Sequence, residues 1–353
     1  MKIRHVLLPA IAALTLSVAC SSDDDNGHGN GSTQKGITGV FVANEGPFDQ
    51  SFGTVTHFDQ ESQTVTQELF QSVNQTQVGN ILQSIGVTPN HFLLVANNSG
   101  LIRVTNDDFE LVKTIEDLQS PRYTLQTGPG VVAITDWSTD AVHFYDQSDW
   151  TSMGSVACNS GPDRMLLDPS NSMLWVINSG GFGTDSTVTR INAASRTAIG
   201  DVKTTGRPNS LVRDANGDIW VLCGGTKDWN DPANNQAGAL IRFNREGDEQ
   251  ARFTFANPNP SPTRLAICPS GNTLYWLSDG GLFSMSTTSS DLPSSPWVDG
   301  SFYGLGVDPS SGDVYASNAK DFASNGEVKV YSDNGQLSHT FAAGIIPGNF
   351  TFK

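Results

Sequence analysis

The stretch "LLDPSNSMLWVINSGGFGTDSTVTRIN", residues 166–192, holds the pattern that decides the fold. Its Asp-Pro turn at residues 168–169 separates two short apolar runs, and turns of this chemistry close β-hairpins. The run "LWVIN" ends in Asn178, and a glycine-rich loop leads from it to "VTRIN", where apolar and polar residues alternate as in a half-buried strand. The stretch therefore predicts consecutive antiparallel strands joined by one short turn and one longer loop.

The same run recurs along the whole chain. Its seven copies are "VFVAN" from Val40, "LLVAN" from Leu93, "VAITD" from Val132, "LWVIN" from Leu174, "IWVLC" from Ile219, "LYWLS" from Leu274 and "VYASN" from Val314. The copies are about 46 residues apart on average, a spacing that falls in the range of propeller blades. A second alternating strand follows every copy, and a short strand with a tight turn precedes most of them. The sequence therefore predicts four strands per unit.

The two ends of the repeat region complement each other. The first copy lacks a leading strand, whereas the terminal "GIIPGNFTFK", residues 344–353, matches leading segments such as "GRPNSLVRD", residues 206–214. We therefore expect the C-terminal strand to complete the first blade, which removes the exposed sheet edges. The predicted fold is all-β: a seven-bladed β-propeller of four-stranded antiparallel blades. Eight blades are the alternative, but no eighth copy supports them.

The beginning of the chain resembles the secretion signal of a bacterial lipoprotein. Lys2 and Arg4 precede an apolar stretch that ends at Ala19, which is too short to span a bilayer because a span takes roughly 20 apolar residues. The motif "LSVAC", residues 16–20, resembles a lipobox, so Cys20 is predicted to carry a lipid. An ordinary signal sequence cut near Ala19 is the alternative.

These features divide the chain into three parts. Residues 1–19 are the predicted signal peptide, residues 20–36 a flexible acidic and glycine-rich tether, and residues 37–353 the propeller. An acidic run directly after the lipidated cysteine resembles the export signal of lipoproteins that face the cell exterior, so we expect a lipid-anchored protein of the outer membrane. A spacer that faces the periplasm is the alternative.

Composition narrows the range of partners. The chain has a formal net charge of −16, so phosphate backbones would be repelled and nucleic acid is not expected as a partner. Cys158, Cys223 and Cys268 are widely spaced and fall in different blades, so we interpret them as small buried residues; the sequence leaves their redox state open.

The long loops of the chain are predicted to lie on one face of the propeller. In a blade, the loops between second and third strands lie on the same face as the links between blades, and both classes hold the unusual residues. The links place Arg122, Arg164 and Arg264 around one opening, and the insert "CGGTKDWNDPANNQAG", residues 223–238, adds Trp229 to its rim. The predicted ligand-binding residues are Asn44, Arg122, Trp137, Arg164, Asn178, Phe182, Trp229, Arg264, Tyr303 and Asn349. Salt bridges between blades are the alternative role of the arginines.

The sequence lacks recognisable catalytic motifs. The histidines fall in different blades, so they predict neither a metal site nor a base beside a nucleophile. Asp136, Asp185 or Asp279 could act as a base on the loop face, but no spacing singles out a pair. We therefore expect no enzyme activity, no metal and no cofactor.

Several motifs are similar to those of a known family. "VFVANEGPF" (residues 40–48), "SPRY" (120–123), "YGLGVDP" (303–309) and the terminal "GIIPGNFTFK" resemble the YncE-like, surface-layer-type propeller lipoproteins of Bacteroidota, a family with a domain of unknown function. Its best understood members resemble BtuG, which captures cobalamin and caps a TonB-dependent outer-membrane transporter. The resemblance implies capture of cobalamin or a related corrinoid and its delivery to such a transporter. There are two alternatives: a protein-binding scaffold, and a propeller lyase or hydrolase.

Overall fold

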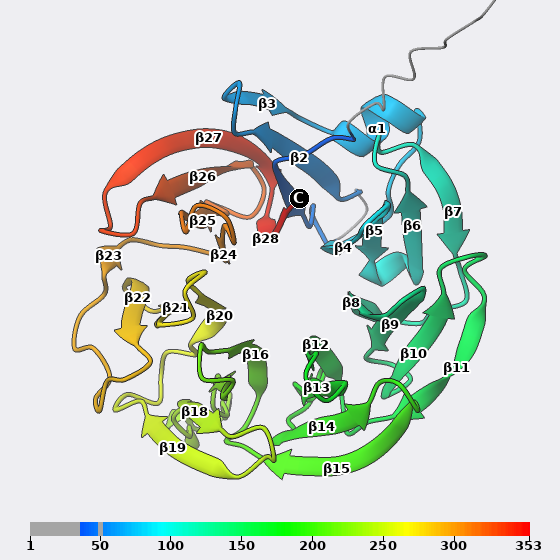
Figure 1. Cartoon of the computed structure of the whole chain (residues 1–353). Helices are drawn as coiled ribbons and strands as arrows, with labels where there is room; N and C mark the ends of the chain where they lie inside the picture. The colour runs from blue at the N-terminus through cyan, green and yellow to red at the C-terminus, as the bar shows by residue number, and fades with distance from the viewer. Residues whose placement is uncertain (1–35, 49–51) are drawn as a thin grey trace, which may run out of the picture. The chain divides into compact units, whose positions relative to one another are not determined.

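The computed structural model describes residues 36–48 and 52–353. Within these residues the chain forms seven four-stranded antiparallel sheets, arranged as blades around a centre (Figure 1). The predicted seven-bladed propeller is thereby confirmed. The predicted signal peptide, Cys20 and nearly all of the predicted tether lie outside the described residues.

The strands of each blade follow one another from the centre to the perimeter, except that the first blade takes its inner strand from the C-terminus. Blades one and two consist of β28 (Pro347–Phe352), β1 (Val40–Asn44), β2 (Thr54–Asp59) and β3 (Thr64–Thr66), then β4 (Leu82–Thr88), β5 (His91–Ala96), β6 (Leu101–Thr105) and β7 (Leu111–Ile115). Blades three and four consist of β8 (Pro121–Gly128), β9 (Val131–Asp136), β10 (Ala141–Asp146) and β11 (Ser152–Ala157), then β12 (Pro162–Asp168), β13 (Met173–Asn178), β14 (Thr187–Asn192) and β15 (Thr197–Lys203). Blade five consists of β16 (Pro208–Arg213), β17 (Ile219–Cys223), β18 (Ala239–Phe243) and β19 (Glu249–Thr254). Blades six and seven consist of β20 (Thr263–Ile267), β21 (Thr273–Ser278), β22 (Gly281–Ser286) and β23 (Val298–Asp299), then β24 (Gly304–Val307), β25 (Val314–Asn318), β26 (Asn325–Tyr331) and β27 (Leu337–Ile345).

The C-terminal strand closes the ring, as the sequence predicted. β28 pairs antiparallel with β1, with Val42 opposite Phe350 and Ala43 opposite Asn349. Beyond the strands, the Gly39 amide donates to the Lys353 carbonyl at 2.9 Å. The first blade is therefore built from both ends of the described chain, and Asn349 is fixed at its inner edge.

Hydrophobic clusters between neighbouring blades form the core. Trp175 on β13 packs with Val221 and Ile241 of the next blade, and Trp220 on β17 packs with Leu274 in the same way. Each tryptophan is fully buried. Burial of an aromatic side chain removes roughly 150–250 Å² from water, or about 4–6 kcal/mol before the entropy cost. These tryptophans hold neighbouring blades together.

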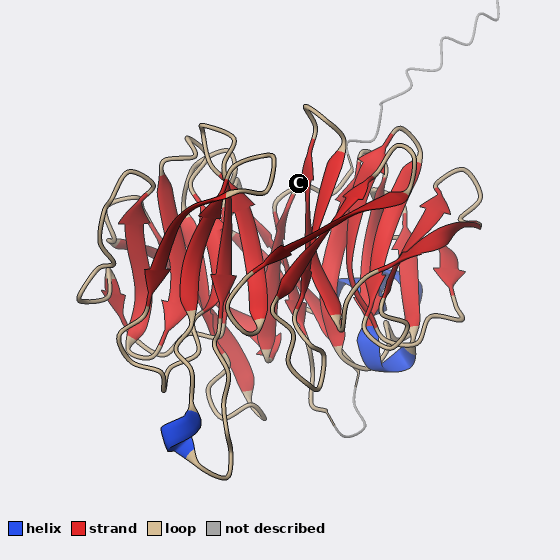
Figure 2. Ribbon diagram, turned by 90° about the horizontal axis from the view of Figure 1, so that it is seen from below, coloured by secondary structure: helices blue, strands red, loops and turns tan. Residues whose placement is uncertain are grey.

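The two faces of the ring carry different connections (Figure 2). We call them the turn face, with the tight turns after each inner strand, and the loop face, with the longer loops and the links between blades. The short helices are α1 (Leu69–Asn74) in the link after blade one, and η1 (Asn97–Ser99) and η2 (Pro232–Asn234) in loops of the loop face. The described chain starts at the turn face, where the Ile37 amide donates to the Asp107 carbonyl at 2.9 Å.

The three described cysteines are free thiols. Cys223 is fully buried, in agreement with the prediction, but Cys158 and Cys268 are partly exposed. The expectation of buried residues is therefore wrong for these two, because Cys268 lies at a turn and Cys158 lies just after an outer strand.

Candidate functional site

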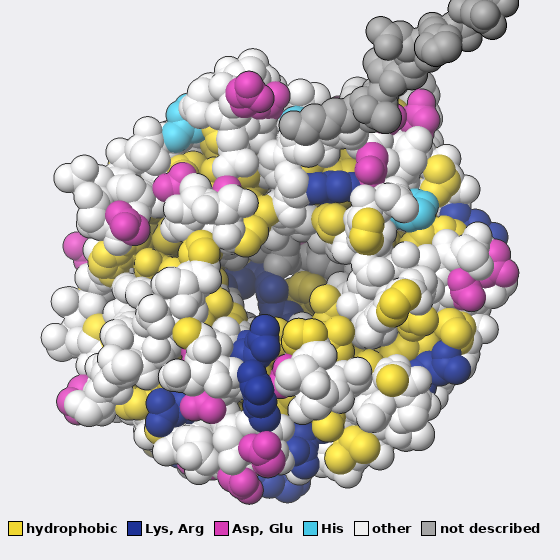
Figure 3. Space-filling model, in the orientation of Figure 1, with side chains coloured by type: hydrophobic (Ala, Val, Ile, Leu, Met, Phe, Trp, Pro, Cys, Tyr) yellow, Lys and Arg dark blue, Asp and Glu magenta, His cyan; other side chains and the backbone are white. Residues whose placement is uncertain are grey.

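A cavity of about 1200 Å³ opens on the loop face. Its lining comes from links between blades, such as Ser120 and Arg207, and from loops after second strands, such as Asn97 and Trp229. Every blade contributes to it. Figure 3, which views the ring from the turn face, shows a central hollow with Lys and Arg side chains in it and beside it. The two connection classes therefore meet around one opening, as expected from the sequence.

The charge of the cavity is opposite to that of the chain. Its lining carries four arginines and one lysine against two aspartates and one glutamate, whereas the chain has a net charge of −16. Basic groups in a concave site with low-dielectric walls concentrate anions. The cavity is therefore suited to a negatively charged ligand.

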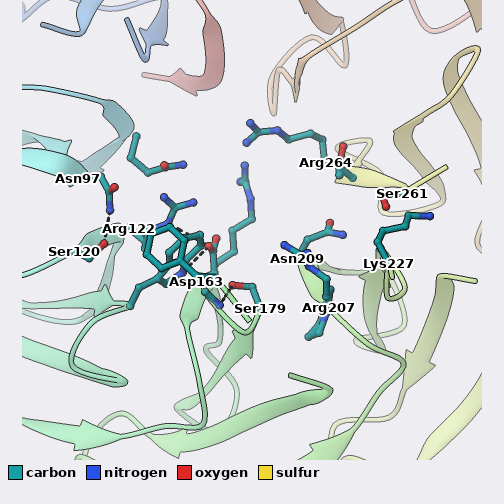
Figure 4. Close-up of a pocket in the computed structure, with 18 of the residues that line it drawn as sticks. Asn97, Ser120, Arg122, Asp163, Ser179, Arg207, Asn209, Lys227, Ser261 and Arg264 are labelled. Atoms are coloured by element: carbon teal, nitrogen blue, oxygen red, sulfur yellow. Dashed lines mark hydrogen bonds and ion pairs between the residues drawn. The ribbon is translucent and has the colours of Figure 1, made fainter. Parts of the chain in front are cut away.

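Arg122, Trp137 and Asp163 form a closed cluster on one wall of the cavity. Figure 4 shows Arg122 and Asp163 of this cluster next to each other. The guanidinium carbon of Arg122 lies 3.7 Å from the centre of the Trp137 ring. Asp163, which is 6% exposed, accepts from Arg122 Nε at 3.3 Å and from the Trp137 indole at 3.0 Å. Arg122 thus forms the salt bridge between blades that was its alternative role. Its guanidinium also lines the cavity, where ligand binding stays a prediction.

Arg164 and Arg264 meet at one amide. Arg164 Nη2 donates to Asn349 Oδ1 at 2.6 Å, and Arg264 Nη1 donates to the same oxygen at 3.2 Å. Both guanidiniums also lie over tyrosine rings, Tyr123 at 4.6 Å and Tyr303 at 5.5 Å respectively. Arg264 adopts a φ of 64°, a left-handed conformation that costs a non-glycine residue about 1–3 kcal/mol and that clusters at functional sites.

An acid lies beside this pair. Glu45, in the loop after β1, accepts from the Tyr303 hydroxyl at 3.0 and 3.1 Å and lies 3.8 Å from Arg264 Nη2. Burial raises the pKa of Glu45, and Arg264, Tyr303 and Arg122 offset only part of that effect. Burial and the neighbouring carboxylate also raise the pKa of Tyr303. Glu45 is therefore a carboxyl group that can hold a proton near neutral pH more readily than an exposed glutamate.

Aromatic side chains stand at the rim. Phe182 is 99% exposed and Trp229 88% exposed. The insert that carries Trp229 is ordered by its own polar groups: Asp228 accepts from the amides of Asn230 and Asp231, and a β-bridge joins Thr226 to Gln236 at its base. These exposed rings can cover an apolar ligand surface at the mouth of the cavity.

Seven of the ten predicted residues line the cavity: Arg122, Trp137, Arg164, Phe182, Trp229, Arg264 and Tyr303. Asn44 and Asn178 do not reach it, because both are fully buried and donate to threonine hydroxyls within their own blades. We correct their assignment to a structural role. Asn349 lies just behind the lining, where it holds the two arginines.

Asp136, one of the aspartates considered as a base, is also structural. Its side chain is fully buried and accepts from the backbone amides of Gln119, Ser120, Ser138 and Thr139. It shapes the loop and the link of blade three from behind.

Sequence reasoning missed five charged groups of the lining, namely Glu45, Asp163, Arg207, Lys227 and Asp228. Arg207 precedes a proline at the start of an inner strand, as Arg122 follows one, so the repeat offered a signal for it. Asp163 stands next to Arg164 in the same link. Glu45, Lys227 and Asp228 lie in loops between second and third strands, which the sequence places on the face of the opening, but nothing in the sequence shows which side chains of these loops turn to the cavity.

Residues 36–48 and 52–353 contain neither a metal-binding cluster nor a membrane-spanning helix. No group of three or more His, Cys, Asp or Glu side chains is placed to hold a metal ion. No helix there is long and apolar enough to cross a membrane.

Comparison with known proteins identifies the fold. No protein-family model matches the chain, and no curated protein sequence matches it. Among solved structures, a quinonprotein alcohol dehydrogenase-like protein from Bacteroides thetaiotaomicron has a TM-score of 0.69 at 14% identity and covers 89% of this chain and 78% of its own. The periplasmic gluconolactonase of Pseudomonas aeruginosa has a TM-score of 0.65 at 13% identity and covers 89% of this chain and 99% of its own. A streptogramin B lyase has a TM-score of 0.57 at 10% identity and covers 76% of this chain and 85% of its own.

These structures correct one expectation. Because proteins of similar fold are named as a lactonase and a lyase, the fold is compatible with enzymes, and the expectation that this chain has no enzyme activity is not kept. Identities of this size carry no residue roles from one protein to another. The comparisons show that the chain is a seven-bladed β-propeller, a fold that serves binding proteins, scaffolds and enzymes.

Proposed function

We propose that the protein captures a bulky small molecule that carries a negatively charged group, and that it does so in the loop-face cavity. The observation that carries this proposal is the convergence of Arg122, Arg164 and Arg264, from three different blades, at the floor of one cavity. Guanidinium groups bind carboxylates and phosphates in bidentate fashion. The volume of about 1200 Å³ exceeds the roughly 300–1,000 Å³ of pockets for drug-sized ligands.

A corrinoid such as cobalamin is the first ligand to test. It is broad, bears amides around its ring and carries one phosphate, which matches a wide mouth with exposed aromatic rings, asparagines such as Asn97 and Asn209 in the wall, and basic groups at the floor. In this proposal a lipid on Cys20 anchors the protein to the outer membrane, with the cavity exposed to the exterior.

The ligand would then pass to a TonB-dependent transporter in the same membrane. The exposed rim residues Phe182 and Trp229 support a protein partner at the mouth, since aromatic residues are enriched in protein interfaces. A pull-down of the lipidated protein from its outer membrane, with and without added cobalamin, tests this step. Recovery of the transporter supports delivery, and recovery of an unrelated surface protein favours a scaffold.

Isothermal titration of the protein with cyanocobalamin tests capture. We expect saturable binding at micromolar protein, weakened at least tenfold by Arg264→Gln. Arg252→Gln is the matched control, because Arg252 pairs with Glu249 on the outer strand of blade five, away from the cavity. No binding heat at micromolar protein rejects the corrinoid, and equal binding by both variants rejects the cavity as its site.

Hydrolysis of a lactone at the same site is the second candidate. The observation that favours it is the partly buried Glu45, whose raised pKa and contact with Tyr303 suit general acid–base chemistry. Turnover of a gluconolactone above the uncatalysed rate, abolished by Glu45→Gln, would promote this candidate. Turnover that survives the substitution would exclude Glu45 as the base.

A further inference from the structure

The pair Arg164 and Arg264 is held together without an equal pair of negative charges. Arg164 comes from β12 of blade four and Arg264 from β20 of blade six, so neither neighbouring strands nor one blade forces them to meet. They meet at Asn349 Oδ1, which lies across the channel on β28 of blade one. The Asn349 amide nitrogen donates to the Gln83 carbonyl at 2.6 Å, which fixes the oxygen toward the arginines.

Nearby negative charges do not compensate both positive charges of this pair. Among the described residues, Arg164 has no ion pair, and Arg264 has only the 3.8 Å contact with Glu45. The nearby Asp163 is already engaged by Arg122 and the Trp137 indole. Burial and the neighbouring Arg264 lower the pKa of Arg164, yet an arginine stays charged because its ordinary pKa exceeds 12.

Two like charges on one neutral oxygen repel each other, and the backbone of Arg264 is strained as well. An anion between the guanidiniums would relieve the repulsion. Among the residues that the structure describes, Asn349 alone accepts hydrogen bonds from both guanidiniums, so its amide sets the gap into which such an anion fits.

From this geometry we propose that Arg164 and Arg264 bind a tetrahedral oxyanion, the phosphate or sulfate group of the captured ligand, and that Asn349 is the positioning residue of this subsite. The inference rests on the proposed capture function. A tetrahedral group presents oxygens in several planes to donors that approach from different blades, whereas a carboxylate presents two oxygens in one plane. The ligand class is therefore a phosphorylated or sulfated small molecule.

Titration of the full-length protein with inorganic phosphate, sulfate and acetate at constant ionic strength tests the subsite. We expect phosphate and sulfate to bind, and acetate to bind at least tenfold more weakly. Asn349→Asp places a carboxylate between the two arginines and neutralises them from within, so it should weaken phosphate binding at least tenfold. Arg252→Gln, which also removes one positive charge from the protein, should leave phosphate binding unchanged.

Arg164→Gln keeps the test decisive if Asn349→Asp lowers the melting temperature too far. It leaves Asn349 and its bond to Gln83 in place and should weaken phosphate binding by a similar factor. Phosphate binding that is unchanged in both variants, absent in the wild type, or matched by acetate overturns the subsite. These outcomes can be distinguished from those of the cyanocobalamin titration. If the wild type and Asn349→Asp bind cyanocobalamin equally, capture is upheld and the subsite is rejected. If the wild type binds phosphate but not cyanocobalamin, the subsite is upheld and the corrinoid is rejected.

Discussion

Single side chains in and behind the lining of the cavity hold its arginines in place. Asp163 accepts from Arg122 and Trp137, and Asn349 accepts from Arg164 and Arg264. The residue types and their places at the starts of inner strands could be predicted from the repeat. The partner of each arginine could not, because a single sequence does not show which side chain of another blade lies across the channel.

Glu45 makes the stability of the fold depend on pH. Burial is the largest cause of its raised pKa, so the folded protein binds this proton more tightly than the unfolded chain does. Ionised Glu45 therefore costs folding free energy above its folded-state pKa, and the cost disappears as the pH falls below the ordinary glutamate pKa of about 4.3. We expect Glu45→Gln to raise the melting temperature by a few degrees at pH 7.5 and to have little effect at pH 4.

Thermal unfolding of the wild type and of Glu45→Gln between pH 4 and pH 7.5 measures the difference in their melting temperatures. Glu45→Asp is the matched control, because it keeps an ionisable carboxyl. If Glu45→Gln melts at a lower temperature than the wild type at pH 7.5, the contact of Glu45 with Arg264 outweighs the cost of burying the carboxylate.

The cysteines differ in expected reactivity. Burial raises the pKa of Cys158 and Cys223 to about 12, so both thiols stay protonated at pH 8. Burial by itself would raise the pKa of Cys268. The hydrogen bonds from Ser270 and from the neighbouring turn outweigh burial, so the pKa of this thiol is lowered. In a chain that carries Cys20→Ser, we expect Ellman's reagent to modify Cys268 rapidly and to reach the other two only on unfolding. Rapid modification of more than one thiol in the native protein would contradict this.

Loops are added to the blades without being part of their core. In blade five, the insert between β17 and β18 is closed at its base by the Thr226–Gln236 bridge, and its polar residues bond mostly with one another. Its position and its exposed tryptophan could be predicted, because a long polar segment interrupts a regular repeat. The contact of Lys227 with the carbonyls of Pro258 and Asn259 in the next link could not be.

Replacement of residues 227–235 by Asn-Gly tests this independence. The bridge at the base suits a two-residue hairpin turn. We expect the free energy of unfolding to change by no more than about 1 kcal/mol, as for surface changes, while affinity for the captured ligand falls at least tenfold. Calorimetry and denaturant unfolding measure the two effects. Unfolding of the variant under native conditions would show that the insert supports the blade.

The ring as a unit depends on its last strand. Spacing, turn chemistry and the missing first strand were enough to predict seven blades and their closure, because each signal is local or periodic. The links also predicted three arginines around the opening. The remaining charges of the lining, such as Lys227 and Glu45, could not be predicted in this way, because they reach the cavity only when the loops of several blades meet.

Removal of residues 347–353 should therefore disrupt both fold and site. The strand supplies Phe350 and Phe352 to the cluster between blades one and seven, and each Phe→Ala change in a core costs about 3–5 kcal/mol. We expect a loss of at least about 5 kcal/mol, measured by denaturant unfolding. Phe352→Leu is the control that keeps the strand and most of the apolar volume. Native stability of the truncated chain would show that closure by β28 is dispensable.

Anomalous diffraction from crystals soaked in tungstate, a tetrahedral oxyanion, locates the anion site most directly. The arrangement of the cavity floor predicts a tungsten peak on the loop-face side of Asn349, between the guanidinium groups of Arg164 and Arg264. Tungsten peaks found only elsewhere, with these two arginines unchanged, would contradict the assignment of the loop-face cavity as an anion-binding site.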